Sequence, residues 1–368
     1  MDGYMTENVI GRGAYGTAYM CKSKATGKRY VKKQVRLARQ SNKERQASIT
    51  ELRILSNISH RNVLRLVDAW VESGCVAVTI TELCECGDLL SQLRARCDAQ
   101  RPFEEVHLQD MIVQLASCLQ YLHSNGLCHR DVKPANVFIS DTGCLKLADF
   151  GLATVLKDGL SDTLCGTPNY MCPELISERP YGAKSDVWAL GCVMYELTAL
   201  KPAFSAFDMP GLVRKITKGP MPVLHGAYSE QWRDAVRWML TREEASRPTA
   251  ADILALPFLQ DAVMRVQQRH GPPLPPGSDG VIHLEHLPLA LARLANRFDE
   301  QDREAELRAA DDDVHRKEQQ LRFAPAALQQ RWGKELEGAR MRAAALRKKL
   351  GLPKAACGGG GRGVSGAR

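Results

Sequence analysis

The first third of the chain carries mainly strand-like hydrophobic patterns with one helical pattern, and the remainder carries mainly helical patterns. Residues 7–10 and 18–21 are strand-like, 30–35 alternates between two faces, and 76–81 is a β-branched run that predicts a buried strand. Apolar positions three and four residues apart predict helices over 43–57 and 108–123. Short strands are predicted at 137–138 and 145–147, and a buried helix is predicted to begin at 184.

The last hundred residues follow a different pattern. A stretch rich in Pro and Gly at 271–280 indicates a linker, which we place at 260–282. Apolar residues recur at helical spacing in 287–298 and in 328–350, on either side of a charged stretch. We expect a helical region over 283–350, with two alternatives open: a short coiled coil, or a helix that packs on the preceding domain or frays alone. Residues 351–368 are Gly-rich and basic, and are expected to be disordered.

Composition favours a soluble globular protein. The 368 residues are 44% hydrophobic and 25% charged, enough for one large or two ordinary domains. No apolar run approaches the roughly 20 residues of a membrane helix, and no signal peptide is visible. The 12 cysteines contain no C-x-x-C pair, which favours reduced thiols over disulfides or a zinc site. We therefore expect a cytoplasmic protein without a membrane anchor.

The positive charge is concentrated at the end of the chain. The whole chain has 50 Lys and Arg against 42 Asp and Glu, a net charge of +8. Residues 321–368 hold 11 basic and 2 acidic residues, or +9, which leaves −1 for the other 320 residues. The tail can therefore attract an anionic partner, but it carries no recognition motif, so no specific nucleic acid is predicted.

Two neighbouring motifs carry the chemistry of phosphoryl transfer. The loop at 129–138 brings together Asp131, Lys133 and Asn136, and Asp149 follows on a short turn. Asp131 can accept a hydroxyl proton, and Lys133 can neutralise a phosphoryl oxygen. Asn136 and Asp149 offer the hard oxygen ligands that Mg2+ prefers. The alternative is a polar loop that arose by chance. The further motifs described below occur in the order of a known signature set, which argues against that alternative.

A glycine-rich motif lies near the start. Residues 11–16 (Gly-Arg-Gly-Ala-Tyr-Gly) form a G-x-G-x-x-G, which alone is weak because glycines also make ordinary turns. A dinucleotide-binding loop would open a helix, whereas this motif lies between two strand-like runs. The context predicts a lid whose backbone N–H groups cover ATP phosphates.

The motifs resemble the signature set of eukaryotic protein kinases over residues 4–259. Three runs, at 133–138, 166–171 and 36–40, resemble the NIMA-related (Nek) branch. The run at 36–40 is similar to the plant and green-algal members of that branch. Asn169 and Cys172 differ from the residues that the family often has at these positions. The two differences bear on which substrates are preferred. The resemblance implies an α+β, bilobal protein kinase fold, with a small β-rich N-lobe, a larger helical C-lobe and a C-terminal helical or coiled-coil tail.

The resemblance also implies the roles of individual residues, with ATP and Mg2+ as cofactors. It assigns catalysis to Asp131 and Lys133, supported by Lys33 and Glu51, and metal binding to Asn136 and Asp149. The implied ATP-binding residues are Ile10, Gly11, Arg12, Gly13, Ala14, Gly16, Ala18, Val31, Lys33, Thr81, Glu82, Cys84, Asp88 and Phe138.

Several of these assignments combine the resemblance with local geometry. Lys33 shares a strand face with Val31, so Lys33 is the predicted nucleotide lysine and Lys32 is expected to point to solvent. Glu51 lies 18 residues later (51 − 33) on a predicted helix and is expected to pair with Lys33. A solvated surface Glu is the alternative.

The hinge and its neighbourhood come next in the chain. Thr81 falls at the gatekeeper position, and its small size predicts a back pocket open to bulky inhibitors. Glu82 and Cys84 fall on the implied hinge. Asp88 has two open roles, a contact to the ribose or the N-cap of the next helix.

The segment 152–172 resembles an activation segment. Thr163 lies at the spacing of the family's activating threonine, and Arg130 is the expected counter-charge for a phosphate there. Thr167 is expected to orient the catalytic loop. Further structural roles are implied for Asp186, as a brace of the catalytic loop, and for Glu174 and Arg247, as a pair.

The predicted function is that of an ATP-dependent protein serine/threonine kinase activated by phosphorylation at Thr163. Protein substrates are the implied partners. The C-terminal helices suggest a homodimer, and the resemblance adds microtubules, with the cytoskeleton, cilium and nucleus as further locations. Two alternatives stay open: a pseudokinase scaffold, and a protein acting mainly through binding of an anionic partner by its tail.

Overall fold

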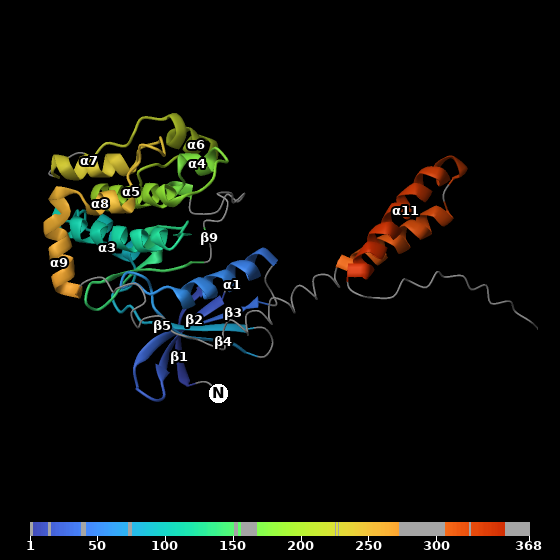
Figure 1. Ribbon diagram of the computed structural model, residues 1–368, viewed down its shortest axis with the longest axis horizontal. Coiled ribbons are helices and arrows are strands. Elements are labelled where there is room, and N and C mark those ends of the chain that lie inside the picture. Colours follow the sequence, from blue (N-terminus) through green and yellow to red (C-terminus); the bar gives the residue numbers. More distant parts are fainter. Residues whose placement is uncertain are drawn as a thin grey trace, which may run out of the picture. The chain divides into compact units, whose positions relative to one another are not determined.

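The computed structural model describes residues 3–13, 16–37, 42–72, 76–150, 154–155, 168–224, 226, 228–271, 306–323 and 325–349. For residues 13, 42–47, 154–155 and 326–327 it describes the backbone alone. The chain divides into two compact units, residues 1–287 and 288–368 (Figure 1).

The first unit begins with a five-stranded antiparallel sheet, in the strand order β1-β2-β3-β5-β4. Helix α1 (Asn42–Asn57) accompanies the sheet and buries Ile49, Leu52 and Ile54 (Figure 1). This is the expected small N-lobe. Its strands are β1 (Tyr4–Gly13), β2 (Gly16–Ser23), β3 (Arg29–Arg36), β4 (Leu66–Glu72) and β5 (Val76–Glu82).

The expectation that Lys32 points to solvent is wrong. Its side chain is 4% exposed, its ammonium lies 5.5 Å from the ring of Trp70, and it pairs with Glu72 at 3.7 Å. Tyr4 stacks on the same Trp70, with ring centroids 6.1 Å apart. The alternation placed Lys32 on the outer face correctly, but aromatic side chains from β1 and β4 cover that face. The apolar stem of a lysine packs well under such rings.

The larger C-lobe is built around two helices. Helix α3 (Glu105–Ser124) buries half of its residues and helix α5 (Ala183–Ala199) buries most of its residues, against each other and their neighbours. The other elements are α2 (Leu89–Asp98), β6 (Leu127–Cys128), η2 (Pro134–Asn136), β7 (Val137–Ile139), β8 (Leu145–Leu147), β9 (Thr154–Val155), η3 (Pro168–Tyr170), α4 (Pro173–Ile176), α6 (Met209–Lys218), α7 (Glu230–Met239), α8 (Ala250–Leu254) and η4 (Pro257–Leu259).

The expected linker begins too early. Residues 260–270 form helix α9 (Gln260–His270), which packs against α3 and buries Ala262 and Val266. Pro and Gly are frequent only from Gly271 onward. The prediction extended the linker back over residues 260–270, which are helical. The remainder of the expected linker lies outside the described residues.

The described part of the second unit, residues 306–323 and 325–349, contains two helices, residues 306–322 and α11 (Ala326–Lys349). Ion pairs join them in antiparallel order: Glu318 with Arg340 at 2.7 Å, Asp313 with Arg342 at 3.4 Å and Asp311 with Arg347 at 2.6 Å. Leu307, Leu336, Ala339 and Ala343 form its buried seam. Residues 306–349 therefore form an antiparallel hairpin within one chain, and residues 283–305 of the predicted helical region lie outside the described residues. A coiled coil between chains stays a prediction.

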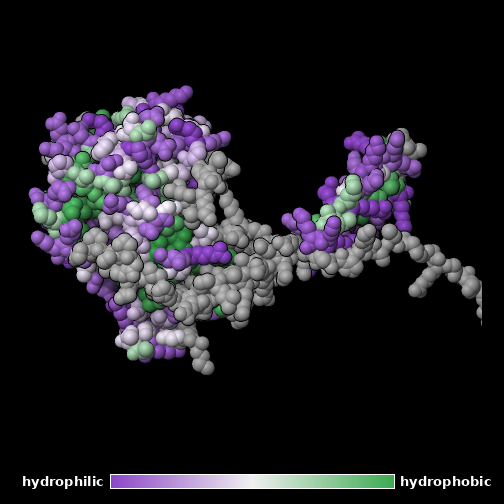
Figure 2. Space-filling view, viewed as in Figure 1, coloured by the Kyte–Doolittle hydropathy of each residue, from purple (hydrophilic) through white to green (hydrophobic). Residues whose placement is uncertain are grey.

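The described surface is mostly hydrophilic in the view of Figure 2, and on the hairpin the hydrophobic residues gather along one stripe. Within the described ranges, no helix combines the length and the apolar character needed to cross a bilayer. The cysteines in the same ranges are free thiols, as expected.

Candidate active site

The loop between β6 and β7 gathers the predicted catalytic residues around the carboxylate of Asp131. Lys133 donates to its Oδ2 at 2.6 Å. Asn136 donates from Nδ2 to the same oxygen and to the backbone carbonyl of Asp131, each at 2.9 Å. Since the amide nitrogen makes both bonds, the amide oxygen of Asn136 is the atom that can face a cation. Asp131 and Asn136 are 8% and 7% exposed, so the cluster lies at the base of the site.

Asp186, near the start of α5, braces this loop. Its fully buried carboxylate accepts the backbone N–H groups of His129 and Arg130, each at 2.9 Å, and the Tyr181 hydroxyl at 2.7 Å. Burial alone would raise the pKa of Asp186, but the hydrogen bond from His123 and the surrounding donors lower it overall. These contacts are the ones expected of a brace for the catalytic loop, and the role of Asp186 stays a prediction.

His129 links the loop to the second motif. Its ring is buried, and burial lowers its pKa, so the imidazole is neutral. Nε2 donates to the carbonyl of Ala148 at 3.1 Å, and the ring meets Phe150 edge-on at 4.8 Å. These contacts hold the residue before Asp149 and the residue after it against the catalytic loop.

Arg130 and Asp149 both adopt left-handed backbone conformations, with φ of 71° and 68°. Such φ values are uncommon outside glycine and persist where the surroundings fix the backbone. Asp186 fixes Arg130 through its N–H, while Phe150 anchors the turn at Asp149 through its buried ring. The two motifs thus store backbone strain at the points where their side chains must be aimed.

The predicted ion pair between β3 and α1 is present. Lys33 Nζ lies 3.4 Å from Glu51 Oε1. The Glu51 carboxylate raises the pKa of Lys33, with a further contribution from Asp149, so the ammonium stays charged. Lys33 therefore stands between the carboxylate of α1 and the predicted metal ligand.

The glycine motif forms the turn between β1 and β2, where Gly13 pairs with Gly16. A Cβ at Gly16 would lie 2.2 Å from the Gln34 carbonyl oxygen, so the close approach of β3 requires glycine here. A Cβ at Gly11 would meet no described atom within 4 Å. Gly11 therefore borders open space, where a phosphate chain can approach the backbone. Ala14 lies outside the described residues.

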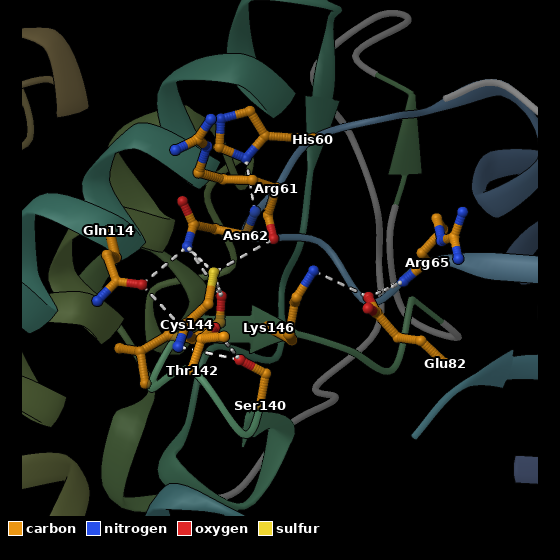
Figure 3. A network of polar contacts seen from close by, with 11 residues as sticks. His60, Arg61, Asn62, Arg65, Glu82, Gln114, Ser140, Thr142, Cys144 and Lys146 are labelled. Carbon is orange, nitrogen blue, oxygen red and sulfur yellow. Dashed lines mark hydrogen bonds and ion pairs between the residues drawn. The ribbon is translucent and has the colours of Figure 1, made fainter. Parts of the chain in front are cut away.

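The predicted hinge follows β5. Thr81 pairs with Val31 across the sheet, which places the gatekeeper beside the strand of Lys33. The side chain of Glu82 accepts the Arg65 N–H at 2.8 Å and pairs with Lys146 at 3.0 Å (Figure 3). It therefore joins the lobes, and any contact of Glu82 with a nucleotide falls to its backbone. Burial raises the pKa of the Cys84 thiol to about 12, so Cys84 is a neutral group.

Asp88 caps helix α2. Its carboxylate accepts the backbone N–H of Ser91 at 2.7 Å, which favours the N-cap role over the ribose contact. Its backbone bridges to Phe138 on β7. This bridge places Phe138, the residue expected under the adenine, next to the end of the hinge.

Glu174 and Arg247 form the expected pair, and both side chains are 0% exposed. Ser185 donates to Glu174 Oε1 at 2.6 Å. Burial opposes the change, but Arg247 and Ser185 lower the pKa of Glu174 overall. Thr163 and Thr167 lie outside the described residues, so their roles stay predictions.

Two contacts at the site were missed by sequence reasoning. Tyr170 donates its hydroxyl to Glu196 at 2.5 Å, which joins η3 to the C-terminal end of α5. Lys146 pairs with the hinge residue Glu82. Both contacts involve polar residues in otherwise apolar runs. Such a residue indicates a functional role or a buried polar pair, but the pattern does not identify the partner residue.

The site suits a nucleotide and a divalent cation. Lys133 and Asn136 bind the Asp131 carboxylate, and Asp149 acts electrostatically on Lys33, so the site holds two ammonium groups and two hard oxygen donors. Phosphate groups need cations and backbone N–H donors, and Mg2+ needs a few carboxylate or amide oxygens plus phosphate oxygens. The donor set matches that requirement.

Comparisons with known proteins agree with this geometry. Residues 4–259 match the family described as Protein kinase domain. The chain is 41% identical over 273 residues to Serine/threonine-protein kinase Nek3 of Oryza sativa subsp. japonica, which covers 74% of this chain and 46% of the relative. It is 39% identical over 259 residues to Serine/threonine-protein kinase Nek4 of Mus musculus, covering 70% of this chain and 32% of the relative. The chain thus spans about half, or less, of the length of these curated relatives.

Proposed function

Because the chain belongs to the protein kinase family, within its NIMA-related branch, we propose that it is a protein serine/threonine kinase that uses MgATP. The observation that supports this most directly is the Asp131 cluster, with Lys133 and Asn136 on the same carboxylate. All the metal and lysine positions that the family needs are filled, which argues against a pseudokinase scaffold.

In the proposed reaction, Asp131 orients the substrate hydroxyl and accepts its proton. Lys133 steadies the transferred phosphoryl group, and Lys33, held by Glu51, binds the α- and β-phosphates. Asn136 and Asp149 would hold Mg2+, which neutralises the charge on the phosphate oxygens. Each residue positions a group or balances a charge, and none forms a covalent intermediate.

We further propose that phosphorylation of Thr163 raises activity. A phosphate adds about −1.5 to −2 charges, and Arg130, next to Asp131, is the proposed counter-charge. The guanidinium of Arg130 lies 5.2 Å from the Tyr181 ring, which orients it.

We base two further proposals, for partners other than protein substrates, on the C-terminal region. Eleven basic against two acidic residues over 321–368 support binding of an anionic surface such as a microtubule. The exposed Met341 on α11 supports pairing with a second copy, since it lies outside the hairpin seam. Salt-dependent cosedimentation with microtubules and the mass in solution of the full chain test these two proposals.

The test of the kinase function compares the full chain with Asp131→Asn and Asp141→Asn. Asp141 lies in the exposed turn between β7 and β8, so its substitution removes the same charge outside the site. With labelled ATP, Mg2+ and a generic Ser/Thr substrate, we expect turnover in the parent and in Asp141→Asn. Asp131→Asn should lose about 10²–10⁴-fold in kcat, the typical contribution of a general base. Equal turnover in all three proteins would remove the assignment.

A further inference from the structure

The loop after α1 is fastened to the C-lobe. The Ser59 N–H is bound by the Tyr121 hydroxyl at 2.9 Å, and the ring of His60 stacks on that tyrosine at 5.1 Å. Asn62 donates to Gln114 Oε1 at 3.1 Å and to the Leu145 carbonyl at 2.9 Å (Figure 3). The loop at the C-terminal end of α1 is therefore fixed to the C-lobe and can act as a pivot. The rest of the helix belongs to the N-lobe.

Glu51 lies six residues from that end of the helix (57 − 51). At 1.5 Å per residue this is a lever of about 9 Å, so a tilt of about 5° would move Glu51 by roughly 1 Å. Its distance to Lys33 is 3.4 Å, longer than the ~2.7–2.9 Å of a strong charge-assisted bond. A small tilt of α1 therefore decides whether the pair is tight or broken.

Arg61, inside the fastened loop, reaches the chain that follows the catalytic domain. Its Nη1 donates to the carbonyl of Gly271, the residue directly after α9. Helix α9 is held in turn by the buried Asp110 of α3, which accepts two bonds from Arg265, at 2.8 and 3.0 Å, and pairs with Arg269 at 3.4 Å. The bond between Gly271 and Arg61 therefore connects the end of α9 directly to the loop that acts as the pivot of α1.

We propose that Arg61 is a positioning residue, and that α9 with Gly271 forms a strap that sets the tilt of α1 and hence the geometry of the Lys33–Glu51 pair. The proposal rests on the proposed kinase function of the same site. It extends the catalytic unit beyond residue 259, where the family match ends.

The test uses the full chain with three substitutions. Arg61→Ala removes the strap contact, Asp110→Asn weakens the other end of α9, and Arg65→Ala removes an exposed charge from the same loop. We expect Arg61→Ala to raise the KM for ATP and the Kd for MgADP by about three- to tenfold, the usual range for coupling through packed contacts. Asp110→Asn should act in the same direction, Arg61→Lys should restore most of the affinity, and Arg65→Ala should stay within about twofold.

A double-mutant cycle separates positioning from general damage. In a Glu51→Gln background the ion pair is already lost, so Arg61→Ala should cost almost nothing further in MgADP affinity. Additive losses would overturn the proposal. Hydrogen exchange of the α1 amides supplies a readout without nucleotide: it should quicken in Arg61→Ala and not in Arg65→Ala, and equal rates would also overturn it.

These outcomes are separate from those of the kinase assay. A parent protein that binds MgADP without turnover would contradict the proposed function, while its MgADP affinities would still judge the coupling. A fully active parent with unchanged KM, Kd and exchange in Arg61→Ala would contradict the strap and leave the kinase function standing.

Discussion

Glu174 and Arg247 lie 73 residues apart in the chain and meet in a two-pronged ion pair with no exposure of either side chain. The pair joins α4, which follows the predicted activation segment, to the loop before α8. The indole of Trp188 lies against the guanidinium, 5.1 Å from ring to cation. Two charges this deep must stay paired, because neither has access to water.

Removal of one partner should therefore be costly. Arg247→Ala leaves a buried carboxylate, and we expect it to lower the free energy of unfolding by about 3–5 kcal/mol. Arg247→Lys should rescue little, since an ammonium cannot reproduce both bonds. Urea unfolding measures the change, with Arg237→Ala as control: its exposed pair with Asp234 should contribute less than about 1 kcal/mol. A similar loss in both Ala variants would contradict this prediction.

Acid should destabilise the fold through His60. Burial, with the charges of Arg61 and Lys146, lowers its pKa from 6.5 to about 4. Between these values the unfolded chain binds a proton that the folded chain does not, so stability falls as pH falls. From pH 7 to pH 5 this amounts to about 2 kcal/mol.

The variant His60→Asn should lose less stability than the parent between pH 7 and pH 5, by about that 2 kcal/mol, as measured by urea unfolding at both pH values. If His60→Asn retains the full acid sensitivity of the parent, His60 is not the group responsible.

Turnover should require a divalent cation. A chelator should stop phosphoryl transfer, and added Mg2+ should restore it. Asp149→Asn should raise the Mg2+ concentration for half-maximal rate by at least about tenfold, since even outer-shell partners of a metal contribute 10–100-fold to affinity. Asp234→Asn on the surface of α7 is the matched control. An unchanged Mg2+ requirement in Asp149→Asn would exclude this carboxylate as a ligand.

The C-terminal hairpin should depend on its charge pattern. Arg347→Asp faces Asp311 with a like charge in place of a 2.6 Å pair. We expect hydrogen exchange of residues 306–349 to quicken by about two- to fivefold, because a partly exposed pair contributes at most about 1 kcal/mol. Combining it with Asp311→Arg swaps the charges and should restore slow exchange. A swap no better than the single variant would exclude the antiparallel pairing.

Local periodicity was enough to place the residues that lie on regular elements. Lys33 was separated from Lys32 by strand alternation together with the family's lysine motif, and Glu51 was placed by the family's spacing on a helix that periodicity predicted. The same alternation misjudged the surroundings of Lys32. What covers the outer face of β3 is decided by Tyr4 and Trp70, and one strand's pattern carries no information about them.

Long-range polar pairing was beyond the sequence. The charged stretch before α11 was predicted only as charged, yet its acidic residues register with arginines 22 to 36 positions later. The roles of Asp186 and Glu174 were available from the family resemblance, not from the pattern. The Arg61 contact to Gly271 spans 210 residues and joins a loop to a helix end, where no periodic signal exists.

The orientation of Glu82 has a consequence for drug discovery. Its carboxylate is committed to Arg65 and Lys146, so a substitution there would alter the hinge without deleting a side-chain contact to any compound in the adenine site. A substitution at Glu82 would therefore act on a compound in the predicted adenine site through the position of the backbone, and compounds of different chemistry would share the effect.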